Sequence, residues 1–312
     1  MAFEFQNILA NHIPETSRVT PARKGKYDFA VAYPDPVSLP HTEILECLKE
    51  ALEESGSELA VYPHPQGNTP LRQYVAEKIG RDRDIHVSEN DIILGNGSGQ
   101  PIDMICAVLL NPGDVVITDS FVYGGTLNTL RRHFTDIRGV ASDESGMDPG
   151  ALDKEIEKAI KSGHKPKFVY LIPTFQNPQG WTIPESRRKE LLTVTQKYGV
   201  PILEDDCYVD LNYEKNNYPS IYSLDSSKSV IYVGSFSKII GPGTRMGYVV
   251  APDTMLDKIR IVKSGGGVNQ LAAITIHRYA TSNLNEDIAV RNAILKNKRD
   301  AMLKALNQYF NF

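Results

Sequence analysis

The sequence predicts an α/β fold in which a mainly parallel β-sheet is covered by helices. Short apolar runs rich in β-branched residues alternate along the chain with longer amphipathic stretches, which is the pattern of strands and their covering helices. The 312 residues are enough for one large domain, or for a large domain with a smaller one, each with its own core.

The central part of the chain contains several candidates for each kind of element. The candidate strands are residues 91–94, 114–118, 168–172, 201–204, 229–233 and 246–251. The candidate helices are residues 42–55, 70–79, 100–110, 124–133, 149–162 and 185–198. The segment NPGD at 111–114 predicts a turn between a helix and a strand, because glycine favours the position after a helix.

The two ends of the chain depart from this alternation. The N-terminal segment is rich in proline, as in AYPDPVSLP at 32–40, and predicts an extended arm and linker. From 285 to 312, apolar residues return at helical spacing. A lone helix with an apolar face needs a surface to pack on, so the chain looks unfinished at this end.

Composition narrows the classes of partner. A net charge of -4 gives no reason to expect nucleic acid or an anionic membrane surface. Cys47, Cys106 and Cys207 lie far apart, so neither a disulfide framework nor a metal site is predicted. The sequence shows neither a signal-peptide pattern nor an apolar run of about 18 residues, and we expect a cytoplasmic protein.

The motif GSFSK at 234–238 places Lys238 directly after an apolar strand, at the edge where α/β sheets bind ligands. An isolated lysine of this kind is more typical of a solvated loop. Seven residues later comes Arg245, in GPGTRMGY. Because serine hydroxyls and an arginine fork suit a phosphate, we expect Ser235, Ser237 and Arg245 to surround one beside Lys238.

A second candidate phosphate element is ILGNGSGQPIDM, which predicts a strand, a glycine-rich turn and a helix. The amides around Ser98, Gly99 and Gln100 would point at an anion from the helix N-terminus. Glycine-rich turns of this kind are also common in purely structural roles, so both interpretations stay open on this motif alone. It lacks the lysine of a nucleotide P-loop and the spacing of a dinucleotide fingerprint.

Three further motifs end strands with polar or aromatic residues. In PILEDDCYVDL, Asp205 and Asp206 would be costly if buried unpaired, unless one carboxylate faces a pyridine nitrogen and keeps it protonated. Asn177, in YLIPTFQNPQG, can donate to a phenolate-like oxygen. Tyr123, in DSFVYGG, can lay its ring against a planar cofactor. Each motif alone is also compatible with an ordinary turn or core aromatic.

Taken in order, these motifs resemble the fold-type I enzymes that use pyridoxal 5'-phosphate (PLP). The resemblance is to the class I/II aminotransferases related to aspartate aminotransferase, nearest the branch of 2-aminoadipate aminotransferases and MocR-type regulators. It runs from about Asp28 to the C-terminus and implies a three-layer α/β/α fold with a mainly parallel, seven-stranded sheet. It implies an arm with a small-domain contribution at 1–41, a large PLP-binding domain at 42–283, and the start of a truncated small domain at 284–312.

The resemblance also implies roles for individual residues. Lys238 corresponds to the lysine that holds PLP as a Schiff base and shuttles a proton. Asp205, and not Asp206, corresponds to the partner of the pyridine nitrogen. Tyr208 and Asn177 correspond to the groups that bond the 3'-oxygen of the cofactor.

Other residues correspond to the stacking group, the phosphate site and the dimer contact. Tyr123 corresponds to the aromatic residue that stacks on the ring. Tyr62, in VYPHPQGNTPLR, corresponds to a tyrosine that reaches the phosphate of the neighbouring subunit, which implies a homodimer with shared active sites. The phosphate cup that the resemblance implies consists of Ser98, Gly99, Gln100, Ser235 and Arg245, with Ser237 as an optional member.

The sequence departs from the family pattern in the substrate region. Ala32 stands where the family usually has a glycine near the substrate carboxylate, so the pocket is expected to differ. The family has about another hundred residues beyond Phe312, which include the arginine that grips the substrate α-carboxylate. No residue of this sequence matches that arginine, so we expect a truncated chain, a partial sequence or a degenerate relative.

The resemblance implies a PLP-dependent aminotransferase that moves an amino group between an L-amino acid and a 2-oxo acid by a ping-pong mechanism, with Lys238 as general base. The same electron sink also serves β-lyases, racemases, decarboxylases and oxidases. A PLP-binding sensor without catalysis is a further alternative. The residues before Asp28 are too few and insufficiently basic for the winged-helix domain of such a regulator.

Overall fold

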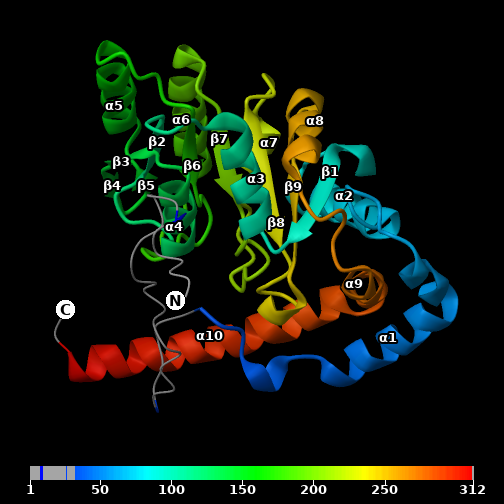
Figure 1. Cartoon of the computed structure of the whole chain (residues 1–312). Helices are drawn as coiled ribbons and strands as arrows, with labels where there is room; N and C mark the ends of the chain where they lie inside the picture. The colour runs from blue at the N-terminus through cyan, green and yellow to red at the C-terminus, as the bar shows by residue number, and fades with distance from the viewer. Residues whose placement is uncertain (1–7, 10–25, 27–31, 311–312) are drawn as a thin grey trace, which may run out of the picture. The chain divides into compact units, whose positions relative to one another are not determined.

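The computed structural model describes residues 8–9, 26 and 32–310. The chain divides into two compact units, residues 1–33 and 34–312, and every element discussed below belongs to the second unit (Figure 1). The division into 1–41, 42–283 and 284–312 that the sequence suggests stays a prediction.

A seven-stranded sheet forms the centre of this unit, with the strand order β1-β9-β8-β7-β6-β2-β3. The strands are β1 (Ile92–Asn96), β2 (Val115–Asp119), β3 (Asp136–Val140), β6 (Phe168–Leu171), β7 (Ile202–Asp205), β8 (Val230–Ser235) and β9 (Met246–Val250). Only β9 is antiparallel to its neighbours β1 and β8. The predicted mainly parallel sheet is confirmed. The carboxyl ends of the six other strands lie at one edge of the sheet, where β9 begins.

A separate two-stranded ribbon pairs β4 (Ser142–Asp143) with β5 (Gly146–Met147).

Helices cover both faces of the sheet, which confirms the predicted three layers (Figure 1). On one face, Tyr170 and Leu203 pack with α3 (Gly99–Leu109), α4 (Gly124–Arg132) and α8 (Asp253–Val262). On the other, Val169 and Ile202 pack with α5 (Pro149–Lys161), α6 (Glu185–Tyr198) and α7 (Ile221–Leu224). Further along this second face, Tyr232 packs with α2 (Thr69–Arg83) and α9 (Gln270–Ser282). Strands buried on both faces explain their continuous apolar runs.

Local capping explains where several helices begin and end. Asn68 accepts a hydrogen bond from the amide of Leu71 at the start of α2, and Asp148 caps α5 in the same way. Both helices carry proline in their first turn. α6 ends at Tyr198, and the left-handed conformation of the capping residue that follows, Gly199, suits glycine. The helices expected from the sequence are therefore present with small changes of boundary, and α2 extends to Arg83.

Two helices flank the covered sheet. α1 (His41–Ser55) packs against α9, and α10 (Leu284–Tyr309) is the helix expected near the C-terminus. Only Leu284 and Arg291 of α10 are buried. None of the helices in the described ranges is both long and apolar enough to cross a membrane.

A buried network of charges ties the sheet to its second face. The carboxylate of Glu204 in β7 accepts hydrogen bonds from the amides of Ile221 and Tyr222 at the start of α7. Arg188 of α6 is fully buried, with Nη1 3.9 Å from Oε1 of Glu204. Its guanidinium donates to three backbone carbonyls, those of Pro173, Ile183 and Pro219. These carbonyls belong to the loops after β6 and β7, which leave the sheet at the edge where the six carboxyl ends lie, called the functional edge below.

We predict that Arg188→Met lowers the free energy of unfolding by roughly 3–5 kcal/mol, because a buried carboxylate loses its cationic neighbour. Urea denaturation measures this loss. Arg187→Met is the matched control, since Arg187 pairs with a half-exposed Asp143 and its removal should cost less than about 1 kcal/mol. Equal losses in the two variants would contradict the structural role of Arg188.

Candidate functional site

Almost every candidate residue lies where a strand ends at the functional edge. Ser98, Gly99 and Gln100 follow β1, Tyr123 follows β2, Asn177 follows β6, and Tyr208 follows β7. Asp205 and Ser235 are the last residues of β7 and β8, with Ser237 and Lys238 directly after, and Arg245 directly precedes β9. Tyr62 is the exception. It follows none of the strands, lies before α2 in the chain and is 98% exposed.

Lys238 lies in the turn after β8 and is partly buried. Its Nζ atom is 5.7 Å from the centroid of the Tyr208 ring. Burial lowers the pKa of the Lys238 amine, because a charged ammonium is poorly solvated in this position. A lysine closer to its neutral form is a better nucleophile and base than a solvated one.

Asp205 is buried beside two neutral hydrogen-bond donors. Its Oδ2 atom accepts from the hydroxyl of Tyr170 at 2.7 Å, and its Oδ1 atom accepts from the thiol of Cys207 at 2.7 Å. Burial raises the pKa of Asp205, whereas the hydrogen bonds from Cys207 and Tyr170 lower it. The two donors therefore favour the charged form of a carboxylate that its surroundings would otherwise neutralise.

Asp206 has a different environment from its neighbour Asp205. Successive side chains of a strand point to opposite faces, and Asp206 continues this alternation just beyond β7. Its Oδ2 atom accepts from Nε of Arg83 at 2.8 Å and from the hydroxyl of Tyr232 at 3.1 Å. An arginine thus already balances Asp206, which leaves Asp205 as the acid of this pair that faces the functional edge.

Asn177 and Tyr208 meet although they follow different strands. The Nδ2 atom of Asn177 donates to the hydroxyl of Tyr208 at 2.8 Å. Burial raises the pKa of Tyr208 to about 12, so its hydroxyl stays protonated at neutral pH. The pair presents one amide and one hydroxyl donor side by side.

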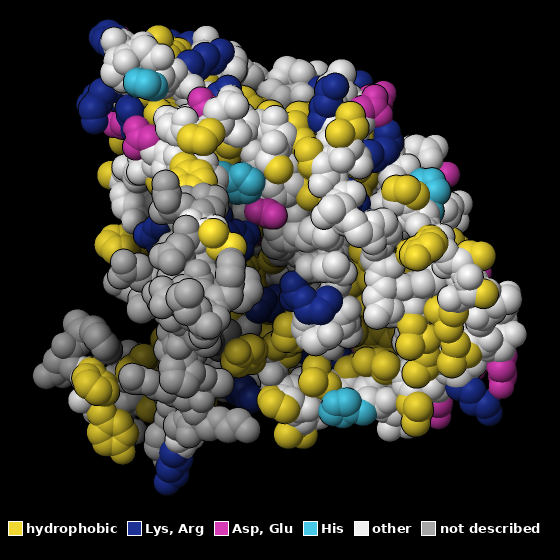
Figure 2. Space-filling view, in the orientation of Figure 1, with side chains coloured by type: hydrophobic (Ala, Val, Ile, Leu, Met, Phe, Trp, Pro, Cys, Tyr) yellow, Lys and Arg dark blue, Asp and Glu magenta, His cyan; other side chains and the backbone are white. Residues whose placement is uncertain are grey.

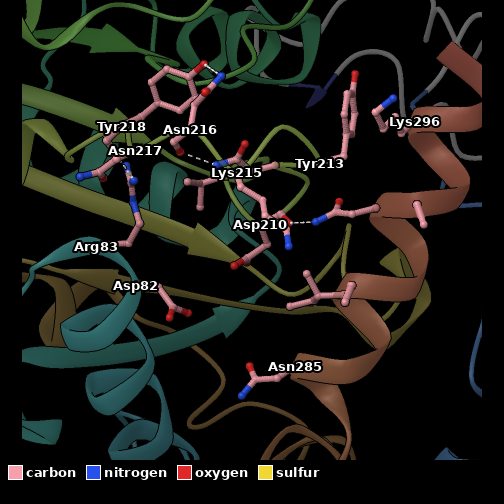
Figure 3. Close-up of a pocket in the computed structure, with 16 residues that line it drawn as sticks. Asp82, Arg83, Asp210, Tyr213, Lys215, Asn216, Asn217, Tyr218, Asn285 and Lys296 are labelled. Atoms are coloured by element: carbon pink, nitrogen blue, oxygen red, sulfur yellow. Dashed lines mark hydrogen bonds between the residues drawn. The ribbon is translucent and has the colours of Figure 1, made fainter. Parts of the chain in front are cut away.

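The loop that follows Tyr208 is supported from outside the sheet. Most residues of the range 209–218 line a pocket of about 630 Å³ together with the end of α2 and the first half of α10 (Figure 3). Asn292 of α10 donates to the carbonyl of Asp210, and Arg299 pairs with Glu214. Arg83 points toward Tyr218 and donates to its carbonyl (Figure 3). The position of Tyr208 therefore depends on contacts with both α2 and α10.

The N-terminus of α3 and Arg245 at the start of β9 outline a candidate anion cradle. Among the described residues, no side chain caps the first turn of α3, and a Cβ atom on Gly99 would meet open space. Nη2 of Arg245 donates to the carbonyl of Asn96 at 2.8 Å, and the guanidinium lies against Gly97. Uncapped amides beside an arginine fork suit a phosphate.

Close backbone packing fixes this cradle. Gly247 of β9 pairs with Ser235 on one side and Gly95 on the other. A Cβ atom on Gly247 would lie 2.5 Å from the backbone of Gly97 and of Ser98. Only glycine at 247 lets the turn before α3 approach the sheet this closely. The hydroxyl of Ser235, bonded to that of Ser237 at 2.9 Å, belongs to the same group of residues.

Two candidate residues are less enclosed. Tyr123 directly precedes α4, is 49% exposed, and lays its ring over Gly125, where a Cβ atom would lie 2.4 Å from the ring. The side chain of Gln100 turns back to the amide of Asn96 at 2.9 Å. Gln100 therefore offers an anion its backbone amide, while its side chain supports the turn.

The structure adds three residues to which the motifs gave no role. Tyr170 is fully buried, and Thr126 of α4 donates to its hydroxyl at 3.0 Å. Cys207 contacts Asp205 and lies 3.3 Å from the hydroxyl of Ser98. A tyrosine inside an apolar strand is a sequence signal for a buried hydroxyl that needs a partner, but it does not identify that partner.

Comparison with known proteins gives consistent matches. The family model described as aminotransferase class I and II matches residues 33–312. Aromatic-amino-acid aminotransferase 1 of Thermococcus litoralis is 35% identical over 279 residues, or 88% of this chain and 67% of the relative. The 2-aminoadipate transaminase of Thermus thermophilus is 31% identical over 306 residues, or 96% of this chain and 74% of the relative. A solved α-aminoadipate aminotransferase from Thermus thermophilus, complexed with N-(5'-phosphopyridoxyl)-L-leucine, superposes with a TM-score of 0.89 at 29% identity, covering 99% of this chain and 78% of that one.

A second acid lies at the same edge. Asp119 ends β2, is 1% exposed, and accepts a hydrogen bond from the hydroxyl of Ser142 at 2.8 Å. Burial raises the pKa of Asp119 to about 7. Between about pH 4 and pH 7 the folded protein therefore holds a proton that the unfolded chain releases, and stability falls as pH rises through this window.

We predict that Asp119→Asn abolishes this part of the pH dependence. Relative to the variant, the wild-type protein should lose on the order of 1–4 kcal/mol of stability between pH 5 and pH 8, measured by urea denaturation. Burial also raises the pKa of Glu204 to about 7. Its contribution to the pH dependence is present in both proteins and cancels when their profiles are compared. Glu190→Gln, an exposed control, should leave the wild-type profile unchanged. Parallel profiles for wild type and Asp119→Asn would contradict the buried, protonated state of Asp119.

Proposed function

The chain belongs to the class I and II aminotransferases and is a PLP-dependent transaminase, and we propose that Lys238 is the residue that binds PLP covalently. The observation that carries this proposal is the placement of Lys238 at the same sheet edge as Asp205. One is a partly buried amine whose pKa burial lowers, and the other is a buried carboxylate that has only neutral partners.

The residues at this edge fit the chemical groups of PLP. The anion cradle of Ser98, Gly99, Ser235 and Arg245 suits the phosphate, with Ser237 and the amide of Gln100 beside it. Asp205 suits a protonated ring nitrogen, and the donors of Asn177 and Tyr208 suit the 3'-oxygen. The half-exposed ring of Tyr123 is available for stacking. We propose these residues as the cofactor site.

Each residue then has a chemical task during amino-group transfer. PLP, when bound, supplies the electron sink for the bond cleaved at the substrate α-carbon. Nζ of Lys238 accepts the α-proton of the amino acid, and its lowered pKa favours the neutral amine that this requires. Asp205 holds a proton on the ring nitrogen. Tyr208 keeps its own proton and donates it in a hydrogen bond together with Asn177.

We propose that the amino donor is an L-amino acid with an aromatic or a long acidic side chain, and that the acceptor is a 2-oxo acid. The names of two relatives support this proposal, since one is an aromatic-amino-acid aminotransferase and the other a 2-aminoadipate transaminase. A cytoplasmic location is consistent with the three cysteines, which are free thiols and suit a reducing compartment.

We further propose a homodimer in which Tyr62 reaches the phosphate site of the partner subunit. Leu59, Val61 and Tyr62 expose 46%, 65% and 98% of their surface, close together in the chain after α1. Figure 2 shows apolar side chains gathered over this part of the unit. An exposed apolar patch of this kind favours a protein interface.

The proposed activity predicts a half-reaction. With PLP bound and no oxo acid added, an aromatic amino acid or 2-aminoadipate should change the cofactor absorbance and release about one oxo acid per site. Lys238→Ala should still hold PLP noncovalently but should lose the absorbance of the covalent form. Continuous release of ammonia or pyruvate would instead support a lyase, and bound PLP that never reacts would support a sensor.

Shared sites predict that two inactive variants complement one another. Mixed dimers of Tyr62→Ala and Lys238→Ala contain one site with both native residues if Tyr62 acts across the interface. Refolding a mixture of the two variants should therefore restore up to about one quarter of the wild-type activity, because half of the dimers are mixed and each has one intact site. Homodimers of either variant are the controls. Activity no greater than the average of the two homodimers would contradict a shared site.

A further inference from the structure

Asp205 is a buried carboxyl group with no cationic partner among the described residues. Among the ion pairs of the described residues, none includes Asp205, whereas Asp206 pairs with Arg83. The two oxygens of Asp205 accept instead from an uncharged hydroxyl and an uncharged thiol. Neutral donors fix the direction of a carboxylate and leave its charge available to a third group, which an arginine would not do.

A hydrogen-bond chain fixes the direction of the Tyr170 proton. Thr126 donates its hydroxyl proton to the Tyr170 oxygen at 3.0 Å, and Tyr170 in turn donates to Oδ2 of Asp205 at 2.7 Å. Thr126 is 3% exposed and Tyr170 is fully buried, so water does not compete for these groups. Burial also raises the pKa of Tyr170 well above its usual value, which keeps the phenol a donor.

The chain links three separate parts of the fold. Thr126 comes from α4, Tyr170 from β6 and Asp205 from the end of β7. β6 and β7 are parallel neighbours, and α4 packs on the face to which Tyr170 points. Cys207 approaches from the other oxygen of Asp205 and also contacts Ser98 at the start of α3. The carboxylate is therefore held by β6 and α4 on one side and, through Cys207, is linked to Ser98 of the proposed phosphate cradle on the other.

We propose that Tyr170, directed by Thr126 and assisted by Cys207, is a positioning residue that keeps Asp205 charged and aimed at the cofactor's ring nitrogen. The inference rests on the proposed role of Asp205 and adds residues that do not themselves touch the reacting atoms. It predicts that removing one phenol oxygen weakens ring-nitrogen protonation while the phosphate cradle remains intact.

The test compares two tyrosines that differ in which acid they contact. Tyr170→Phe removes the donor to Asp205, and Tyr232→Phe removes the corresponding donor to the adjacent Asp206. Each variant is loaded with PLP labelled with ¹⁵N at the ring nitrogen, and the ¹⁵N chemical shift reports protonation directly. Tyr170→Phe should move this shift toward unprotonated pyridine and slow the half-reaction about 10- to 100-fold, the size expected for a lost hydrogen bond to a charged group. Tyr232→Phe should change neither readout.

Three further variants keep the inference testable if Tyr170→Phe does not fold. Thr126→Val retains the phenol but removes the donor that directs it, and should give a smaller shift in the same direction. Cys207→Ala should also shift the ring nitrogen, whereas Cys207→Ser retains a donor and should restore the wild-type value. A wild-type ¹⁵N shift in Tyr170→Phe or, if it fails to fold, in Thr126→Val would overturn the inference.

Asp205→Ala separates failure of this inference from failure of the proposed function. If Asp205→Ala changes the ¹⁵N shift and Tyr170→Phe does not, the proposed role of Asp205 stands and that of Tyr170 falls. If neither variant changes the shift, the proposed role of Asp205 is itself wrong. A protein that binds no PLP would contradict both.

Discussion

Six strands of the central sheet run in one direction, so the chain leaves all of their carboxyl ends at the same edge. β9 alone runs the opposite way, and it brings Arg245 to that edge at its beginning. Every other described feature of the proposed site depends on this arrangement. Residues from 96 to 245 in the sequence meet because parallel strands stack their loops together, and Gly247 lets the turn before α3 approach closely enough to share one anion cradle.

The adjacent acids Asp205 and Asp206 have different roles at this edge, because one has neutral partners and the other forms an ion pair. Strand alternation directs Asp206 toward Arg83 and Asp205 toward Tyr170. Asp206 forms an ion pair with Arg83 that links α2 to the sheet. Asp205 is surrounded by neutral donors, so its charge remains available to a ligand. Glu204 and Arg188 also have structural roles, on the face opposite Asp205. Their contacts hold the loops after β6 and β7 in place.

Much of the fold and of the site could be predicted from local sequence, and the remainder depends on contacts between distant segments. Continuous apolar runs indicated the buried parallel strands, and the polar motifs that follow them indicated the edge. β3 was not predicted because its sequence, DIRGV, mixes charged and apolar residues at the margin of the sheet. α9 contains the β-branched run Ile274–Ile276 and is helical because it packs on α1 and α2. Tyr170 could not be assigned a role either, since Asp205 and Thr126 reach it only through the pairing of β6 with β7 and the packing of α4. Local motifs therefore identify residues that follow strands, but not the residues that support them from within the sheet.

The most direct test of this account is to locate the covalent attachment of PLP. The PLP-loaded protein is reduced with borohydride, digested, and sequenced by mass spectrometry. A phosphopyridoxyl group is expected on Lys238 alone, and none on the peptide that carries Lys263, a buried lysine whose Nζ atom donates to the carbonyl of Leu94 in β1. A label on another lysine, or no label on protein that shows the absorbance of covalently bound PLP, would contradict it.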